Sequence, residues 1–179
     1  MSTTWVALLR GVNVGGVTVR SADLAAMFRD LGYAEVRTFL ASGNVRFETD
    51  AAPARRASLK AGIEKALRER FGYDAWIVLL TRAELEDAVS AFPFDADDDG
   101  RQPYVLFSSD AAVLAELAEA AASLSDTETD PVAEGTGVLY WNPPKGRTLD
   151  TPFAKVIGRA RYKSTTTSRN LRTLVKIVA

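Results

Sequence analysis

Arginine, glycine and asparagine stand together near the start of this 179-residue chain, in the segment Arg10–Gly16 (RGVNVGG). Glycines of this kind let backbone amides face a ligand, and the neighbouring arginine could pair with a phosphate or a carboxylate. The segment nearly matches two phosphate-binding fingerprints, but Asn13 replaces a glycine of the dinucleotide motif and Val17 replaces the P-loop lysine. The residues alone therefore predict either an anion-binding loop or a tight strand-to-helix turn that requires glycine.

A second polar cluster, Ser42-Gly43-Asn44, separates two predicted strands. Serine and asparagine favour turns because their side chains hydrogen-bond to nearby backbone groups, and glycine and asparagine tolerate left-handed dihedral angles. Taken by itself, this cluster is more simply explained as a hairpin turn than as a binding site.

A third cluster, Arg159–Asn170, combines basic side chains with five hydroxyl groups and leads into the predicted last helix. A helix N-terminus favours an anion because its free amides and its dipole are positive. Arg169 at the start of that helix would oppose the dipole, and this electrostatic cost suggests a negatively charged partner. The alternative is a solvated basic loop, since runs of charge commonly have that role.

Cysteine and histidine are both absent from the sequence. A Ser-His-Asp triad, a cysteine nucleophile, a zinc-thiolate site and a disulfide framework are therefore excluded for this chain acting alone. The acidic run Asp95-x-Asp97-x-Asp99-Gly100 begins like an EF-hand loop, but Leu106 stands where the bidentate glutamate is needed. We therefore interpret the run as a solvated loop and expect neither a metal site nor a cofactor.

The formal net charge of −1 hides a strong polarity along the chain. Residues 1–83 carry 12 basic and 8 acidic side chains, residues 84–142 carry 1 basic and 14 acidic ones, and residues 143–179 carry 9 basic and 1 acidic. A local anion site is therefore compatible with the slightly acidic composition.

The elements expected to position these clusters follow from the hydrophobic spacing. In the first half they are a strand at 5–10, a helix at about 21–31, strands at 36–40 and 45–48, a helix at 53–70 and a strand at 76–80. Ser21 is expected to cap the first helix and Gly32 to end it. The order βαββαβ predicts a ferredoxin-like sandwich, in which two helices cover one face of an antiparallel sheet.

The second half is predicted to be a smaller α+β unit. Thr81 and Glu84 form a capping box for a helix, Asp110 caps another, Thr151 precedes a proline at a helix start, and Ser168 is expected to cap the final helix. Strands are expected at 104–107 and 138–141. We thus predict an α+β protein with a ferredoxin-like subdomain at 1–81 and a second α+β subdomain at 82–179, whose C-terminal helices return to the first. No sequence repeat at a fixed period is visible.

All three tryptophans, Trp5, Trp76 and Trp141, fall in predicted strands. Packing in a core explains them more simply than base stacking does. The RNA-recognition signature of alternating glycines and aromatic residues is absent from the first subdomain.

Three segments in this order resemble the domain-of-unknown-function 1697 family (DUF1697). They are ALLRGVNVGG at 7–16, VRTFLASGNVRF at 36–47 and TTSRNLRT at 166–173. The resemblance implies a bacterial, cytoplasmic protein with two α+β subdomains and brings no established activity. A cytoplasmic location also agrees with a sequence in which no apolar run approaches the length of a membrane span and no signal peptide is visible. Relatives often carry a lysine after the glycine pair where this chain has Val17, which would weaken an anion pocket unless Arg20 or Lys163 substitutes.

The polar members of this signature suggest one pocket for an anionic small molecule, formed by the loop after the first strand, the SGN hairpin and the start of the last helix. The predicted ligand-binding residues are Arg10, Asn13, Gly15, Gly16, Ser42, Asn44, Thr166, Arg169 and Asn170. One alternative is a scaffold or interaction protein in which these groups form internal hydrogen bonds. A second alternative is nucleic-acid binding through the basic C-terminal segment. The residues do not decide whether a reaction is catalysed, and any chemistry would depend on arginine electrostatics because no histidine can act as a base.

Overall fold

The computed structural model describes residues 1–11, 18–40 and 43–179 of the chain. Two compact units are present: the first comprises Met1–Glu86 with Lys176–Ala179, and the second comprises Asp87–Val175. The chain passes from the first unit to the second within helix α3 (Arg82–Ser90) and returns within helix α6 (Leu171–Val178). Both units mix helices with an antiparallel sheet, so the α+β class is confirmed.

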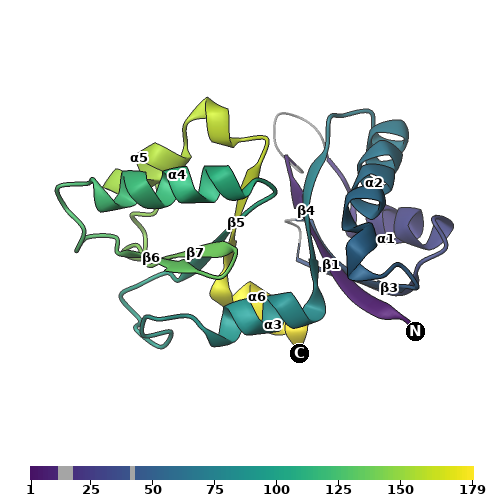
Figure 1. Cartoon of the computed structure of the whole chain (residues 1–179), viewed down its shortest axis with the longest axis horizontal. Coiled ribbons are helices and arrows are strands. Elements are labelled where there is room, and N and C mark those ends of the chain that lie inside the picture. Colours follow the sequence, from purple (N-terminus) through teal and green to yellow (C-terminus); the bar gives the residue numbers. More distant parts are fainter. Residues whose placement is uncertain (12–17, 41–42) are drawn as a thin grey trace. The chain divides into compact units, whose positions relative to one another are not determined.

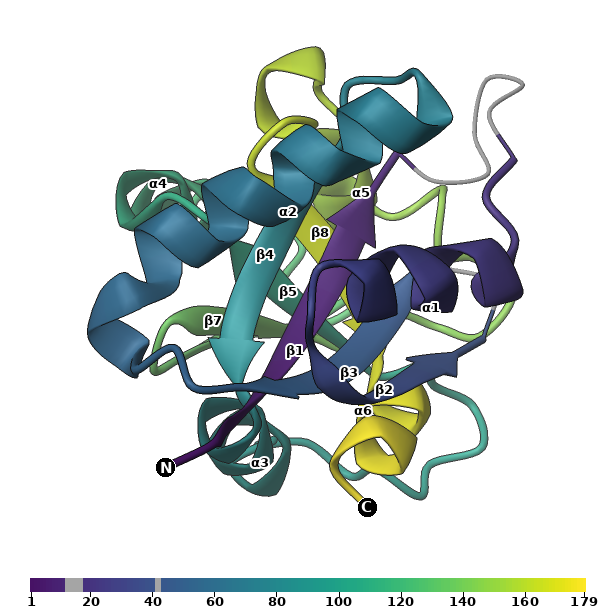
Figure 2. The same ribbon diagram turned by 90° about the vertical axis from the view of Figure 1, so that its right-hand side faces the viewer.

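The first unit follows the predicted order of elements (Figure 1). They are β1 (Thr3–Arg10), α1 (Ser21–Asp30), β2 (Ala34–Phe39), β3 (Asn44–Thr49), the 3-10 turn Pro53–Arg55, α2 (Arg56–Phe71) and β4 (Trp76–Thr81). The strands form one antiparallel sheet in the order β2-β3-β1-β4. Helices α1 and α2 lie over one face of this sheet (Figure 2).

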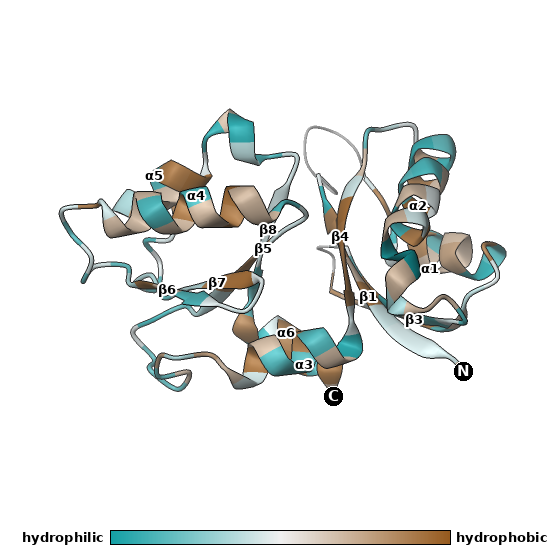
Figure 3. Cartoon of the chain, in the orientation of Figure 1, coloured by the Kyte–Doolittle hydropathy of each residue, from teal (hydrophilic) through white to brown (hydrophobic). Residues whose placement is uncertain are grey.

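The core of the first unit lies between those helices and the sheet. Alternation along the strands decides which residues enter it, because successive side chains point to opposite faces. Trp5, Ala7 and Leu9 of β1 are buried in this core together with Ile77 and Leu79 of β4. The other face therefore carries the alternate residues, and Figure 3 shows how hydrophobic β4 is compared with the hydrophilic outer side of α2.

The local signals that end and begin the helices are largely confirmed. Gly72 ends α2 in a left-handed conformation with φ of 68°. Thr81 and Glu84 form the predicted capping box, with the Glu84 amide donating to Thr81 Oγ1 at 3.2 Å and the Thr81 amide donating to Glu84 Oε2 at 2.9 Å. The expectation for Ser21 was wrong, because it is the first residue of α1 and Arg20 precedes it without a side-chain cap.

The second unit has its own antiparallel sheet, in the order β6-β7-β5-β8. Its elements are β5 (Tyr104–Ser108), α4 (Ala111–Ala122), β6 (Val132–Gly135), β7 (Val138–Trp141), α5 (Pro152–Ile157), the 3-10 turn Ala160–Tyr162 and β8 (Thr166–Asn170). Its core joins the two helices to one sheet face through Leu106, Leu117, Leu139, Trp141 and Phe153. The caps at Asp110 and Thr151 are confirmed, since each side chain accepts a backbone amide of its helix.

Two strands of the second unit are missing from the sequence-based prediction. β6 is short and interrupted by Glu134, so it lacks the apolar run that indicates a buried strand. The segment Thr166–Asn170 was expected to be a loop before a helix capped by Ser168, but it forms β8, which pairs antiparallel with β5. Ser168 therefore lies in a strand, and α6 begins only at Leu171.

The two units share one order of elements. Each consists of a βαββαβ unit followed by a helix, and β5, β6, β7 and β8 occupy the sheet positions that β1, β2, β3 and β4 occupy in the first unit. The chain thus contains an internal structural repeat. It escaped sequence inspection because helix lengths differ between the copies, with 16 residues in α2 and 6 in the equivalent α5.

Candidate functional site

The described ends of two of the three predicted segments lie side by side in the first unit. Leu8 of β1 pairs with Asn44 of β3, and the next amide along β1, that of Leu9, donates to the Gly43 carbonyl at 2.8 Å. Arg10 ends β1 at this same edge, so it stands next to the hairpin. The predicted residues Asn13, Gly15, Gly16 and Ser42 lie outside the described residues.

Asn44 has a structural contact within the hairpin. Its side chain is fully buried, and its Nδ2 donates to the Phe39 carbonyl at 2.9 Å. The turn also places Leu40 at φ of 57° and Gly43 at φ of 74°, in the left-handed region. A buried amide that satisfies a backbone carbonyl across such a turn stabilises the turn conformation.

Trp76 stands directly opposite Arg10. The two residues pair in the β1–β4 ladder, and both lie on the sheet face turned away from α1 and α2. Directly opposed side chains in an antiparallel ladder have Cβ atoms about 5 Å apart. Trp76 is 40% exposed, whereas Trp5 is 0% and Trp141 is 3% exposed. The expectation of core packing is correct for Trp5 and Trp141 and wrong for Trp76.

The signature residues of the second unit lie on β8 and at its end. Thr166 is buried and donates from Oγ1 to the Tyr162 carbonyl at 2.6 Å. Asn170 accepts the Arg172 amide on Oδ1 at 2.9 Å and thereby caps α6. Both contacts hold neighbouring backbone in place.

Arg169 is the second-last residue of β8 and pairs with Val105 of β5. Its side chain is 7% exposed, and NH1 contacts Thr167 Oγ1 and donates to the Ser168 carbonyl at 3.2 Å. The expectation that Arg169 opposes a helix dipole is therefore wrong, because the residue belongs to β8. Because the Arg169 guanidinium is buried, it requires hydrogen-bonding partners within the protein.

A separate cavity of about 590 Å³ lies within the second unit. Residues of α4, the following loop and β6 line it, among them Glu119, Asp126, Asp130 and Glu134. Hydrogen bonds from Thr129 hold the pKa of the Asp126 carboxyl below its ordinary value. None of the residues described as lining the cavity is basic, so this cavity is unsuited to an anion.

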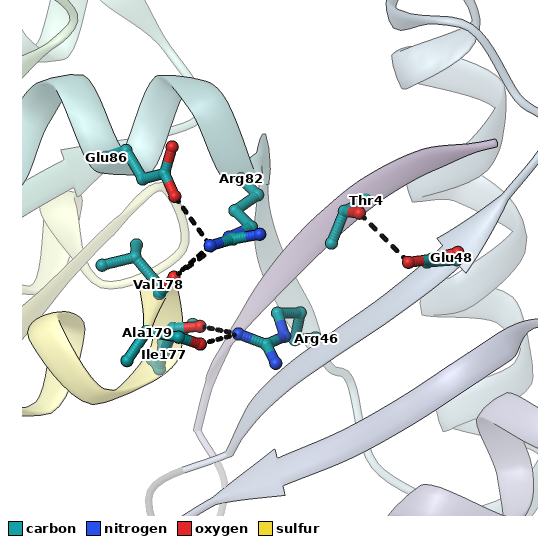
Figure 4. A network of polar contacts seen from close by, with 8 residues as sticks. All are labelled: Thr4, Arg46, Glu48, Arg82, Glu86, Ile177, Val178 and Ala179. Atoms are coloured by element: carbon teal, nitrogen blue, oxygen red, sulfur yellow. Dashed lines mark hydrogen bonds and ion pairs between the residues drawn. The ribbon is translucent and has the colours of Figure 1, made fainter. Parts of the chain in front are cut away.

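A cluster of arginines in the first unit was not singled out from the sequence (Figure 4). Arg46 donates to the Ile177 and Ala179 oxygens at 2.5 and 2.8 Å, and Arg82 donates twice to the Val178 carbonyl at 3.0 and 2.6 Å. Burial, together with the like charges of Arg37 and Arg82, lowers the pKa of Arg46. These arginines therefore satisfy the carbonyl groups that a helix leaves unpaired at its C-terminus. Only the strand position of Arg46, on the face away from the helices, could have indicated this role.

Comparison with known proteins identifies the family of the chain. A family model described as "Protein of unknown function (DUF1697)" matches residues 2–140. The chain belongs to the DUF1697 family. The match includes the first two signature segments and ends before Thr166, so the third segment lies outside it.

A solved structure similar to this chain is that of the conserved bacterial protein SP0830 from Streptococcus pneumoniae. The TM-score is 0.82 at 23% sequence identity, and the likeness covers 99% of this chain and 98% of the other. At this identity the likeness shows a shared fold. No curated protein matches the chain. In the part of the chain that the structure describes, no helix has the length and apolar character needed to cross a bilayer.

Proposed function

We propose that this DUF1697 protein binds a small molecule bearing a phosphate or a carboxylate at the edge of the first sheet where β1 ends. Arg10 supplies the positive charge, and a guanidinium is suited to such groups because its planar fork donates two parallel hydrogen bonds. A cytoplasmic location of the protein also remains a prediction.

The observation that carries this proposal is the adjacency of the end of β1 and the start of β3, where the described parts of the two signature segments lie. The Leu9 amide bond to the Gly43 carbonyl and the pairing of Leu8 with Asn44 bring the end of β1 against the hairpin. Arg10 and Gly43, about thirty residues apart in sequence, therefore lie at the same end of the sheet, as a shared site requires. That Thr166, Arg169 and Asn170 join the same site remains a prediction from the sequence.

A scaffold role is the second candidate, and a specific observation favours it. Asn44, Thr166 and Asn170 each hydrogen-bond to backbone of their own neighbourhood. Polar residues used in this way explain part of the signature by folding alone.

A thermal-shift screen of phosphorylated and carboxylated metabolites separates the two candidates. We expect a compound that raises the melting temperature of the wild type by several degrees and has no such effect on Arg10→Ala. Arg68→Ala, which removes an exposed arginine of α2 in the same unit, is the matched control and should keep the full shift. If nucleotides, sugar phosphates and organic acids all fail to shift the wild type, the binding proposal is rejected and the scaffold role is favoured.

We also assign the ferredoxin-like arrangement to the first unit. The assignment is supported by its βαββαβ order, by the antiparallel sheet order β2-β3-β1-β4 and by two helices on one face. An experimental structure in which β1 is not flanked by β3 and β4 would overturn it.

A further inference from the structure

The first unit exposes one large aromatic ring beside its predicted anion-binding arginine. Trp76 is 40% exposed although it belongs to a strand, and its neighbours Ala75 and Ile77 are buried. A tryptophan has a large apolar ring, so an indole that stays exposed on a strand is available for contact with a ligand.

The position of Trp76 ties it to Arg10. The two residues are direct partners in the β1–β4 ladder, on the face away from the helices, and the two strands run side by side in Figure 2. Arg10 is the last residue of β1 and Trp76 is the first of β4, so both lie at the edge where the hairpin also ends. A ligand at this end of the sheet can contact the indole of Trp76 and the guanidinium of Arg10 together, because the two residues are paired directly across the strands.

We infer that the ligand is a mononucleotide-like molecule, in which an aromatic ring stacks on Trp76 while its phosphate pairs with Arg10. Stacking of a base on an aromatic side chain is tolerant of base identity, since every base has a π-face. The phosphate adds a charge-assisted contact to the arginine. The inference rests on the proposed function and specifies the chemical class that the same site takes.

Binding is measured with four probes: inorganic phosphate, ribose 5-phosphate, adenosine and AMP. Iodide quenching of tryptophan fluorescence reports mainly on Trp76, because Trp5 and Trp141 are buried. We expect AMP to bind at least about tenfold more tightly than adenosine or ribose 5-phosphate and to protect the indole from iodide, in keeping with the strength of base stacking.

Variants then separate the two contacts. Trp76→Leu should weaken AMP about tenfold and leave ribose 5-phosphate within about twofold, whereas Trp76→Phe should keep most of the AMP affinity. Arg10→Ala should weaken both AMP and ribose 5-phosphate, and Arg68→Ala should change neither. Urea unfolding of each variant shows whether it is folded, and if Trp76→Leu is unstable the protection of the wild-type indole from iodide by AMP decides whether the ring is contacted.

The outcomes distinguish this inference from the proposed function. If ribose 5-phosphate binds as tightly as AMP and Trp76→Leu has no effect, the aromatic contact is wrong while anion binding stands. If none of the probes binds, and the wider metabolite screen is also negative, anion binding itself is wrong. A single-stranded oligonucleotide that binds more than about 100-fold tighter than AMP would instead identify a nucleic-acid site and overturn the mononucleotide class.

Discussion

Removing the guanidinium of Arg46 should destabilise the first unit by loosening the C-terminal end of α6. Arg46 projects from β3 and donates to two backbone oxygens of the last three residues, Ile177 and Ala179 (Figure 4). Its guanidinium also lies 5.5 Å from the centre of the Phe39 ring. Arg46→Ala deletes all three contacts and leaves two carbonyl acceptors without that donor.

The magnitude follows from the setting of each contact. The bond to Ile177 is partly buried and made by a charged donor, which is worth about 1.5 kcal/mol, and the exposed bond to Ala179 adds about 0.5 kcal/mol. The cation–π contact contributes about 0.5 kcal/mol at such a site. Arg46→Ala also removes the repulsion from Arg37 and Arg82, which offsets about 0.3 kcal/mol of this cost. The expected loss in the free energy of unfolding is therefore about 2 kcal/mol, or a fall in melting temperature of roughly 4–8 °C.

Urea unfolding at constant m-value measures this loss, and hydrogen exchange of the α6 amides locates it. Arg46→Lys should recover about half, because an ammonium keeps the charge but lacks the fork that reaches two oxygens at once. The exposed Arg68→Ala should lie within about 0.5 kcal/mol of wild type. An Arg46→Ala protein that unfolds within about 0.5 kcal/mol of wild type, with unchanged exchange in α6, would refute the assignment of Arg46 as a helix C-terminal clamp.

Three further predictions concern other contacts. Asn44→Ala should cost about 1–3 kcal/mol in urea unfolding, since it leaves a hairpin carbonyl without its buried donor, and Asn170→Ala should cost less, because the hydrogen bond that it removes is exposed. Partial burial raises the pKa of Glu84, but hydrogen bonds to its carboxylate outweigh this and hold its pKa below the ordinary 4.5. Its stabilising effect is thus complete above about pH 4.5 and is lost as the pH falls through the lower folded pKa, so melting temperatures of wild type and Glu84→Gln should converge in acid. Gly135→Ala should cost about 1–3 kcal/mol, because the added Cβ would lie 2.5 Å from the Tyr140 ring; an unchanged melting curve would contradict this packing.

The sequence was most informative at helix ends, where a given residue type has one common structural role. Glycine at the end of α2, the box at Thr81 and the proline after Thr151 each indicated a helix terminus, because few residues satisfy the exposed backbone groups there. β8 was missed for the opposite reason. Its sequence, TTSRN, has no apolar alternation, and it becomes a strand through its pairing with the buried β5.

The candidate site was predictable in its residue types and not in its geometry. Arginine and glycine at 10–16 predicted either an anion-binding loop or a tight turn, but nothing in that segment showed that Arg10 lies beside the hairpin. Trp76 was assigned to the core because a tryptophan in an apolar run usually belongs there. Its exposure reflects its place as the first residue of β4, because Val78 on the same face of that strand is buried, and this place follows from the register rather than from local sequence.

The internal repeat separates what folding requires of the signature from what it does not. Thr81 and Asn170 are equivalent, since each ends the last strand of its sheet and each side-chain oxygen accepts an amide of the following helix. Capping therefore explains why a polar residue stands at 170. One residue earlier, the second unit has the buried Arg169 where the first has Leu80, paired in each case with a valine.

An apolar side chain thus serves the fold at the position that Arg169 occupies. We predict that Arg169→Leu folds with a loss below about 2 kcal/mol in urea, although the contact with Thr167 and the hydrogen bond to the Ser168 carbonyl are removed. The thermal shift of the same variant with an anionic ligand then tests the prediction from the sequence that Arg169 is a ligand-binding residue. Should Arg169→Leu unfold the protein, the arginine is internal structure and the scaffold role gains. Should it fold and keep the full ligand shift, Arg169 lies outside the binding site, and the anion is held by the first unit alone.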